Sequence, residues 1–238
     1  MKLVSDLKVK LFADGADLNG MLQMYAKPWI RGFTTNPTLM RKAGISDYES
    51  FARQVLQAIP DRPISFEVFA DDFDEMERQG RKIASWGENV YVKVPITNTR
   101  GVSAAPLARK LAAAGVKLNV TALLPLEQVS EITAALAGGP PACVSVFAGR
   151  AADTGVDPVP LMCRALEILA PHPNIELIWA SPRELLNIVQ ADEIGCHIIT
   201  VTNDILSKMP LLGKNLSEYS LETVQMFHRD ATASGFTL

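Results

Sequence analysis

Apolar and polar positions follow two different periods in turn along this chain. Eight short runs rich in valine, isoleucine and aromatic residues recur, and their starts lie roughly 21 to 33 residues apart. Runs of this length and composition are typical of buried β-strands. We therefore predict strands over residues 8–13, 30–34, 63–69, 89–95, 116–121, 142–147, 175–180 and 196–201.

The segments between these runs repeat their apolar residues at the spacing of an α-helix. Residues 72–86 open with acidic side chains, which suit a helix N-terminus, and residues 104–114 and 126–137 end at glycine. Residues 158–169 and 182–194 each begin with proline, which is common in the first turn of a helix. We predict helices over these five segments and over 40–59, and a last helix over about 217–232 after a loop at 208–215.

Strands and helices that alternate at this spacing predict parallel strands joined by right-handed crossovers. The eight units fit a (β/α)8 barrel, and we expect one domain over 1–238 in which 207–238 form a C-terminal loop and helix. A doubly wound open sheet is the alternative. Such a sheet usually carries a glycine-rich phosphate-binding turn after its first strand, and Phe-Ala-Asp-Gly-Ala-Asp at 12–17 does not match one.

The composition excludes several classes of function. The chain has 238 residues, of which 48% are hydrophobic and 21% charged, with a net charge of -3, so it offers a large core but no basic surface for nucleic acid. The first 15 residues lack the apolar segment of a signal peptide, and no apolar run reaches 18 residues. We therefore expect a cytoplasmic protein without membrane contact. Three cysteines and three histidines show no paired metal spacing, so we expect buried free thiols and no metal site.

The predicted strand 89–95 carries a lysine in an otherwise apolar run. In Asn-Val-Tyr-Val-Lys-Val-Pro, Lys93 lies between valines. Burial there would remove solvation from the ammonium and lower its pKa, and a neutral amine can attack a carbonyl to form a Schiff base. The alternative is a lysine at a strand end whose ammonium reaches solvent, as we expect for Lys8, Lys10 and Lys117.

Polar side chains occur at the carboxyl ends of seven predicted strands, where barrel enzymes hold their reactive groups. They are Asp14, Asn36, Glu67, Lys93, Asn119 with Thr121, Ser145 with Phe147 and Arg150, and Ser181 with Arg183. Some have a structural explanation alone, because Asp14 and Asn36 suit turns and Asn119 or Thr121 could satisfy a neighbouring backbone. Glu67 is different, since a carboxylate in an apolar strand needs a partner or a raised pKa. Seven strands with polar groups at one end favour an active site.

Four segments together resemble the signature motifs of the transaldolase family. They are Gly-Phe-Thr-Thr-Asn-Pro-Thr-Leu at 32–39, Val-Lys-Val-Pro at 92–95, Asn-Val-Thr at 119–121 and Phe-Ala-Gly-Arg at 147–150. They occur in the family's order, and the resemblance runs from about residue 8 to residue 206. It implies a (β/α)8 enzyme that needs no metal or other cofactor and moves a dihydroxyacetone unit between sugar phosphates through a lysine Schiff base.

The resemblance also implies a role for each matching residue. Lys93 resembles the Schiff-base lysine, and Asp14 the acid/base that takes the C4 hydroxyl proton when the C3–C4 bond breaks. Glu67 and Thr121 resemble the pair that, through a water, shuttles protons while the carbinolamine forms and dehydrates. The groups that resemble those holding the three-carbon enamine are Asn36, Asn119 and Ser145.

Arg150, Ser181 and Arg183 resemble the family's phosphate site. The predicted helix from Pro182 gives independent support, because backbone N–H groups at a helix N-terminus favour anions and guanidinium groups add charge-assisted donors. The alternative for both arginines is an ion pair with a surface carboxylate.

Two positions distinguish the branches that the resemblance implies. Small fructose 6-phosphate aldolases, which release free dihydroxyacetone, typically have Gln where this chain has Glu67 and Tyr where it has Phe147. A carboxylate relays protons more readily than an amide does, and Phe removes a hydroxyl from the reacting centre. Glu and Phe at these two positions resemble true transaldolases. The resemblance therefore implies a transaldolase of the pentose phosphate pathway, which converts sedoheptulose 7-phosphate and glyceraldehyde 3-phosphate to erythrose 4-phosphate and fructose 6-phosphate.

Several alternatives remain open. The aldolase-type lyase is one, and a catalytically silent barrel that binds sugar phosphates is another. Val146, Pro182 and Trp179 depart from the family pattern near the phosphate corner, so the preferred sugar is left open.

The resemblance implies an oligomer, because small family members form ring-like multimers in which a C-terminal helix reaches a neighbour. Leu221, Val224 and Phe227 form an apolar stripe on the last predicted helix, so this helix packs either on its own barrel or on a neighbouring subunit. We expect a homo-oligomer, although a monomer or dimer is equally compatible with these residues.

Overall fold

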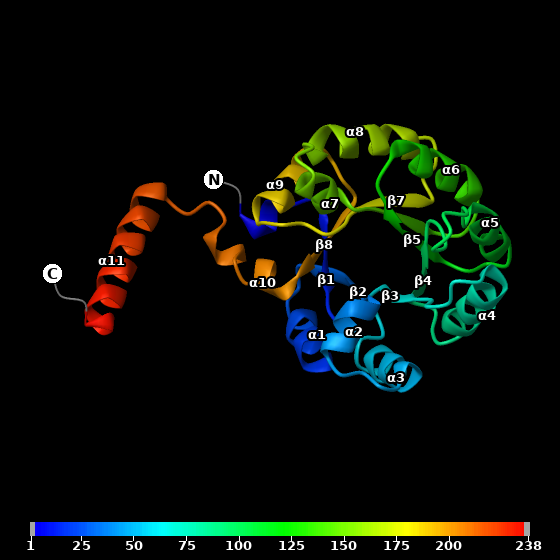
Figure 1. Cartoon of the computed structure of the whole chain (residues 1–238), viewed down its shortest axis with the longest axis horizontal. Helices are drawn as coiled ribbons and strands as arrows, with labels where there is room; N and C mark the ends of the chain where they lie inside the picture. The colour runs from blue at the N-terminus through cyan, green and yellow to red at the C-terminus, as the bar shows by residue number, and fades with distance from the viewer. Residues whose placement is uncertain (1–2, 236–238) are drawn as a thin grey trace.

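The strands close into a barrel. The structure is a computed structural model that describes residues 3–235, and its parallel strands pair in the order β1 to β8 and back to β1 (Figure 1). The strands are β1 Lys10–Asp14, β2 Ile30–Thr34, β3 Ile64–Glu67, β4 Val90–Pro95, β5 Leu118–Leu123, β6 Ala142–Val146, β7 Ile175–Trp179 and β8 Ile198–Thr202. The predicted (β/α)8 barrel is confirmed, and the open sheet is wrong.

Helices follow the strands and surround the barrel (Figure 1). They are α1 Leu18–Tyr25, α2 Pro37–Lys42, α3 Tyr48–Ala58, α4 Phe73–Ala84, α5 Ala105–Ala113, α6 Leu126–Leu136, α7 Ala148–Asp153, α8 Pro158–Leu169, α9 Leu186–Glu193, α10 Asn203–Leu206 and α11 Leu216–Ser234, with 3-10 turns η1 Val4–Asp6 and η2 Met209–Leu211. The sequence patterns predict none of α1, α7 and α10.

Two predicted helices differ from the structure. The helix predicted over 40–59 is wrong in its middle, because α2 ends at Lys42 and α3 begins only at Tyr48. Gly44 adopts a left-handed conformation with φ of 69° after α2, and Asp47 caps α3 by accepting from the Ser50 N–H. The helix predicted from residue 182 begins only at Leu186.

Alternation along the strands separates two apolar cores. The main core lies between the barrel and the helices and includes Leu11 and Phe33. A smaller cluster of Phe12, Cys143, Ile178, Ala180 and Ile198 has the opposite strand parity and fills the barrel interior. Gly32 makes room for the Phe12 ring, since a Cβ at Gly32 would lie 2.5 Å from it. This inner cluster closes the barrel on one side of the polar residues described below.

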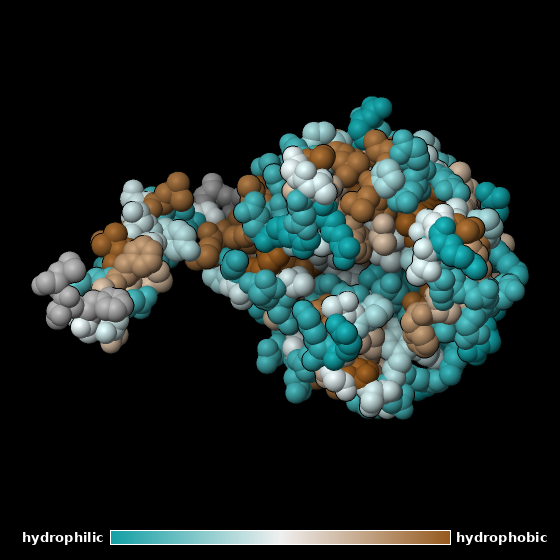
Figure 2. Space-filling model, in the orientation of Figure 1, coloured by the Kyte–Doolittle hydropathy of each residue, from teal (hydrophilic) through white to brown (hydrophobic). Residues whose placement is uncertain are grey.

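Helix α11 lies apart from the barrel (Figure 1). None of its residues is buried, and its apolar side chains Leu216, Leu221, Val224 and Phe227 are 58–82% exposed. Figure 2 shows apolar patches along this isolated helix. Helix α11 therefore does not pack on its own barrel in this structure. Across residues 3–235, no helix combines the length and the apolar character needed to cross a bilayer.

Candidate active site

A cavity of about 700 Å³ opens at the carboxyl ends of the strands. Ten of the eleven candidate residues line it: Asp14, Asn36, Glu67, Lys93, Thr121, Ser145, Phe147, Arg150, Ser181 and Arg183. The exception is Asn119, which is fully buried and does not line the cavity. Closure of the barrel thus brings side chains from seven strands to one site, as barrel geometry requires.

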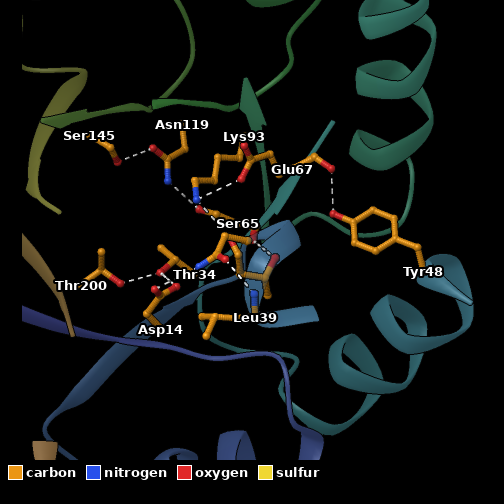
Figure 3. A network of polar contacts seen from close by, with 12 residues as sticks. Asp14, Thr34, Leu39, Tyr48, Ser65, Glu67, Lys93, Asn119, Ser145 and Thr200 are labelled. Atoms are coloured by element: carbon orange, nitrogen blue, oxygen red, sulfur yellow. Dashed lines mark hydrogen bonds and ion pairs between the residues drawn. The ribbon is translucent and has the colours of Figure 1, made fainter. Parts of the chain in front are cut away.

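Lys93 reaches this cavity from inside the barrel wall. Its side chain is only 9% exposed, in contrast to 48% for Lys10, whose ammonium forms an ion pair with Glu176 at 2.6 Å. The Lys93 Nζ lies 3.2 Å from a carboxylate oxygen of Glu67 and donates to the Thr35 carbonyl oxygen at 3.0 Å. Register pairs Glu67 directly with Lys93 across β3 and β4 (Figure 3). A buried amine beside a carboxylate can therefore exchange a proton with it.

Tyr48 contributes to the candidate site, and the sequence patterns do not predict this role. Its hydroxyl donates to the Glu67 carbonyl oxygen at 2.9 Å, and burial raises the pKa of this phenol (Figure 3). The ring packs edge-on against Phe66 and Trp86. Tyr48 comes from α3, so only the folded chain brings it to the end of β3, where it fixes the backbone that carries Glu67.

Asn119 lies beneath the cavity in a short polar ladder. The Ser145 hydroxyl donates to Asn119 Oδ1 at 2.7 Å, and Asn119 Nδ2 donates to Ser65 Oγ at 3.0 Å (Figure 3). All three side chains are buried. Ser65 precedes Glu67 by two residues, so strand alternation could have found it, since both face the barrel interior.

Thr121 lies where the pairing of β5 with β6 is interrupted. The register shifts between Val120 and Leu123, and Ala122 adopts a left-handed conformation with φ of 66°. Such irregularities re-aim side chains at functional sites. The buried Thr121 hydroxyl has no hydrogen-bond partner among residues 3–235, so its bonding capacity remains for a water or a ligand in the cavity.

Asp14 is held by two donors at the end of β1. Thr34 Oγ1 donates to Asp14 Oδ1 at 2.8 Å, and Asn36 Nδ2 donates to Asp14 Oδ2 at 3.3 Å. Loss of solvation raises the pKa of the Asp14 carboxyl, while the nearby Lys93 ammonium and the two hydrogen bonds oppose this rise. A carboxyl with a raised pKa suits a group that must take up and release a proton.

The candidate phosphate corner differs from the expected helix terminus. The Arg183 and Glu184 N–H groups both donate to Asn187 Oδ1, at 2.7 and 3.2 Å, instead of pointing at a ligand. The prediction of free helix N–H groups at Pro182 is therefore wrong, because α9 begins four residues later and its own Asn187 caps this turn.

The two arginines at this corner have different partners. Arg183 forms a bidentate ion pair with Asp153, through Nε at 2.9 Å and through Nη2, which keeps the pKa of Asp153 low. Arg150 stacks over the Phe147 ring at 5.3 Å, and no carboxylate within residues 3–235 forms an ion pair with it. The ion-pair alternative thus holds for Arg183, while the Arg150 guanidinium keeps its charge uncompensated by direct contact.

Close backbone packing shapes the same corner. Ser181 adopts a left-handed conformation with φ of 60°, and its carbonyl oxygen presses against Gly149 so closely that a Cβ there would lie 1.6 Å away. Only glycine fits at this contact between α7 and the loop after β7.

No group of three or more metal-ligating side chains forms within the described part of the chain. Cys143 and Cys196 are buried free thiols as expected, whereas Cys163 is half-buried. Burial raises the pKa of the Cys196 thiol to about 12, so this thiol is protonated at neutral pH.

The sequence matches a family described as Transaldolase/Fructose-6-phosphate aldolase over residues 11–238. The chain belongs to this family. A transaldolase-family protein of Dehalococcoides mccartyi named "Probable transaldolase" is 34% identical, with 89% of this chain and 96% of that protein covered. One of the same name from Methanococcus maripaludis is 32% identical and covers 89% of this chain and 95% of its own.

Solved structures show the fold of this transaldolase-family chain in distant proteins. A 3-hexulose-6-phosphate synthase superposes with a TM-score of 0.59 at 15% identity, covering 84% of this chain and 92% of its own. At that identity the likeness concerns the barrel alone. The family is one of enzymes that act on sugar phosphates, and its description joins two activities, group transfer and aldol cleavage.

Proposed function

We propose that this enzyme is a transaldolase that moves a dihydroxyacetone unit from a ketose phosphate to an aldose phosphate through a Schiff base on Lys93. In the proposed reaction, sedoheptulose 7-phosphate and glyceraldehyde 3-phosphate give erythrose 4-phosphate and fructose 6-phosphate. The strongest support is the position of Lys93, whose Nζ lies at the cavity, 3.2 Å from the Glu67 carboxylate. As part of the same proposal, we assign the reaction to the pentose phosphate pathway and the protein to the cytoplasm.

The first step needs a neutral amine. Glu67 takes a proton from the Lys93 ammonium, and the amine attacks C2 of the ketose to form a carbinolamine. Proton return through Glu67 and a water held by Thr121 then expels the C2 oxygen as water and leaves an imine. The unpartnered Thr121 hydroxyl and the Tyr48 contact that anchors Glu67 both support this assignment.

The second step breaks the C3–C4 bond. Asp14 accepts the C4 hydroxyl proton, the bonding electrons pass to the iminium nitrogen of Lys93, and the aldose leaves with its new aldehyde. The remaining enamine stays on Lys93, where Asn36 and the ladder of Asn119 and Ser145 can hold its hydroxyl groups. Attack of the enamine on an acceptor aldehyde, with return of the Asp14 proton to its oxygen, reverses the sequence. Hydrolysis of the new imine then frees Lys93.

The phosphate of either sugar is assigned to the corner of Arg150, Arg183 and Ser181. Arg150 offers a guanidinium without a direct ion pair among residues 3–235, and the bidentate pair with Asp153 holds Arg183 in place. Arg150 follows β6, Ser181 and Arg183 follow β7, and all three line the same cavity as Asp14 from β1, so a sugar in the cavity can reach both ends.

Trapping tests the covalent step. Borohydride added with fructose 6-phosphate should reduce the imine to a stable adduct on Lys93, which peptide mass spectrometry locates. Lys93→Ala should abolish the adduct, whereas Lys117→Ala should not, because the Lys117 ammonium bonds to the Glu88 carbonyl oxygen away from the cavity. Absence of an adduct on the unaltered enzyme would refute the proposal and favour a silent sugar-phosphate-binding barrel, which fructose 6-phosphate would stabilise without turnover.

An assay with and without an acceptor sugar distinguishes group transfer from aldol cleavage. Glu67 and Phe147 support transfer, as the comparison with Gln and Tyr at these positions implies. Fructose 6-phosphate should give product only when erythrose 4-phosphate is present. Release of free dihydroxyacetone without an acceptor would instead assign the chain to the aldolase-type lyases.

We also propose that the protein is a homo-oligomer in which a neighbouring copy covers α11. The exposed apolar stripe supports this, because Val224 and Phe227 would otherwise remain in water. Phe227→Asp with Val224→Asp should reduce the mass measured by light scattering to that of a smaller species, while Gln225→Asp on the same helix should not. An unaltered protein that is monomeric at micromolar concentration would contradict the proposal.

A further inference from the structure

Two threonine hydroxyls extend the Asp14 contacts across the seam where the barrel closes. Strand β1 pairs with β2 on one side and with β8 on the other. Thr34 Oγ1, from β2, lies 2.8 Å from Asp14 Oδ1 and 2.5 Å from Thr200 Oγ1, which comes from β8 (Figure 3). Thr34 and Thr200 are only 2% and 8% exposed. Neither has a role in the steps above.

The direction of this chain follows from counting protons. An ionised carboxylate can only accept, so the single Thr34 proton must point to Asp14. The Thr34 oxygen is then an acceptor, and the proton between the two threonines must belong to Thr200. Because Thr200 donates to the Thr34 oxygen, the Thr34 hydroxyl cannot donate back to Thr200. Thr200 therefore keeps the Thr34 proton directed at Asp14.

The other carboxylate oxygen is fixed independently. The Leu39 N–H donates to Asn36 Oδ1 at 2.9 Å, so the Asn36 amide must present its Nδ2 to Asp14 Oδ2. Asp14 thus receives one donor on each oxygen, from side chains whose own orientations are fixed by a third group. This arrangement restricts the carboxyl plane, and both Asp14 and Thr200 line the cavity.

We propose that Thr200, through Thr34, is a positioning residue that orients Asp14 toward the substrate and favours its ionised, proton-accepting form. The proposal deepens and rests on the proposed function, in which Asp14 accepts the C4 hydroxyl proton. Donors stabilise a carboxylate more than a carboxylic acid, and hydrogen bonds in series polarise one another. Removal of the Thr200 hydroxyl should weaken the Thr34 donation and leave Asp14 harder to ionise.

Other charges around the cavity remain unchanged in this test. Lys93 from β4 opposes the rise in the pKa of Asp14, and Glu67 from β3 pairs with Lys93. Asp204 from α10, Arg150 and Arg183 line the same cavity. A change at Thr200 alters none of them, so a shift in Asp14 titration would report the hydroxyl chain.

The test compares Thr200→Val, which keeps the shape of the side chain but removes its hydroxyl, with Thr200→Ser, which keeps the hydroxyl. Thr200→Val should lower kcat about 5- to 10-fold, the equivalent of one net hydrogen bond, and move the acid limb of the kcat pH profile to higher pH. Thr200→Ser should restore the position of that limb. Borohydride trapping should be equally complete in both variants, since imine formation does not use Asp14.

A substrate-free measurement keeps the result independent of the proposed function. Carbon-13 NMR of labelled aspartate, with Asp14→Asn for assignment, should show a higher Asp14 titration midpoint in Thr200→Val than in the unaltered enzyme or Thr200→Ser. An unchanged midpoint would overturn the inference even if the unaltered enzyme traps and turns over. Failure of the unaltered enzyme to trap any adduct would instead overturn the proposed function and leave the NMR result to decide the role of the chain.

Discussion

Gly149→Ala is the substitution whose effect the structure determines most directly. Gly149 lies in the first turn of α7, where any residue has acceptable backbone angles, so only space limits the choice. An alanine Cβ would lie 1.6 Å from the Ser181 carbonyl oxygen, 2.6 Å from its carbonyl carbon and 3.4 Å from Arg183 Nε. The first two atoms belong to the backbone, which cannot rotate away as a side chain can.

The required displacement sets the magnitude. The Ser181 carbonyl must move about 1.4 Å to reach the 3.0 Å below which real Cβ contacts essentially never fall. Ser181 already holds a left-handed φ of 60°, so further rotation there adds strain. We expect a loss of about 3 kcal/mol in the free energy of unfolding, at the upper end of overpacking effects. For a domain of this size, that corresponds to roughly 6 to 12 °C in Tm.

The same movement displaces the candidate phosphate corner, because Ser181 and Arg183 lie on the shifted loop. Misplacement by about 1 Å can cost about 100-fold in rate, so kcat/KM for fructose 6-phosphate should fall by one to two orders of magnitude. Borohydride trapping with saturating free dihydroxyacetone, which has no phosphate, should fall much less.

Differential scanning calorimetry and steady-state kinetics measure both effects. Gly80→Ala in α4 is the matched control, since its nearest contact is the end of the Leu111 side chain at 3.3 Å rather than backbone, and Gly80 does not line the cavity. A Gly149→Ala enzyme with unaltered Tm and kcat/KM would refute the reasoning that this contact maintains the corner.

Three further predictions concern polar side chains at or beneath the cavity. Tyr48→Phe removes the donor to the Glu67 carbonyl oxygen and should slow adduct formation on Lys93 several-fold, with little change in KM. Single-turnover trapping measures the rate of adduct formation, and a rate equal to that of the unaltered enzyme would contradict the anchoring role of Tyr48. Ser65→Ala leaves Asn119 Nδ2 buried without a partner and should cost about 1 to 3 kcal/mol in urea unfolding, whereas no loss would mean that the ladder adds nothing. Asp14→Asn should abolish turnover but gain stability relative to the unaltered enzyme as pH rises above 3.8. Because folding raises the pKa of Asp14, the unaltered enzyme loses stability as this group ionises; a relative gain that shrinks with rising pH would contradict the sign.

Local patterns were sufficient where a feature depends on one segment and its period. Valine-rich runs with a single polar residue near their ends predicted the strands, and parallel closure then required those ends to meet, so Lys93 and Glu67 could be placed at one site. Gly44 and Asp47 suit a helix end and a helix start, so the sequence does contain a signal for the break between α2 and α3. The apolar spacing across 40–59 favours one continuous helix and outweighs that signal.

Other features depend on which segments become neighbours. Asn187 could not be recognised as the cap of the Arg183 turn until α9 was seen to begin at Leu186. Tyr48 reaches Glu67 only because α3 packs behind β3, and no period in either segment encodes that contact. The sequence predicts the apolar stripe of α11, but it does not predict that this helix lies away from the barrel.

The sequence by itself determined the barrel, because the strand and helix periods and the parallel pairing they imply are properties of short segments. It also determined which residue types arrive at the carboxyl ends, including Lys93 and Asp14. Only the tertiary structure decided how these groups are held. The contact of Thr34 with Thr200 exists because closure places β1 between β2 and β8, which brings together residues 166 positions apart. Hydrogen bonds require ångström-scale distances between particular atoms, and such distances are fixed by packing of the whole chain.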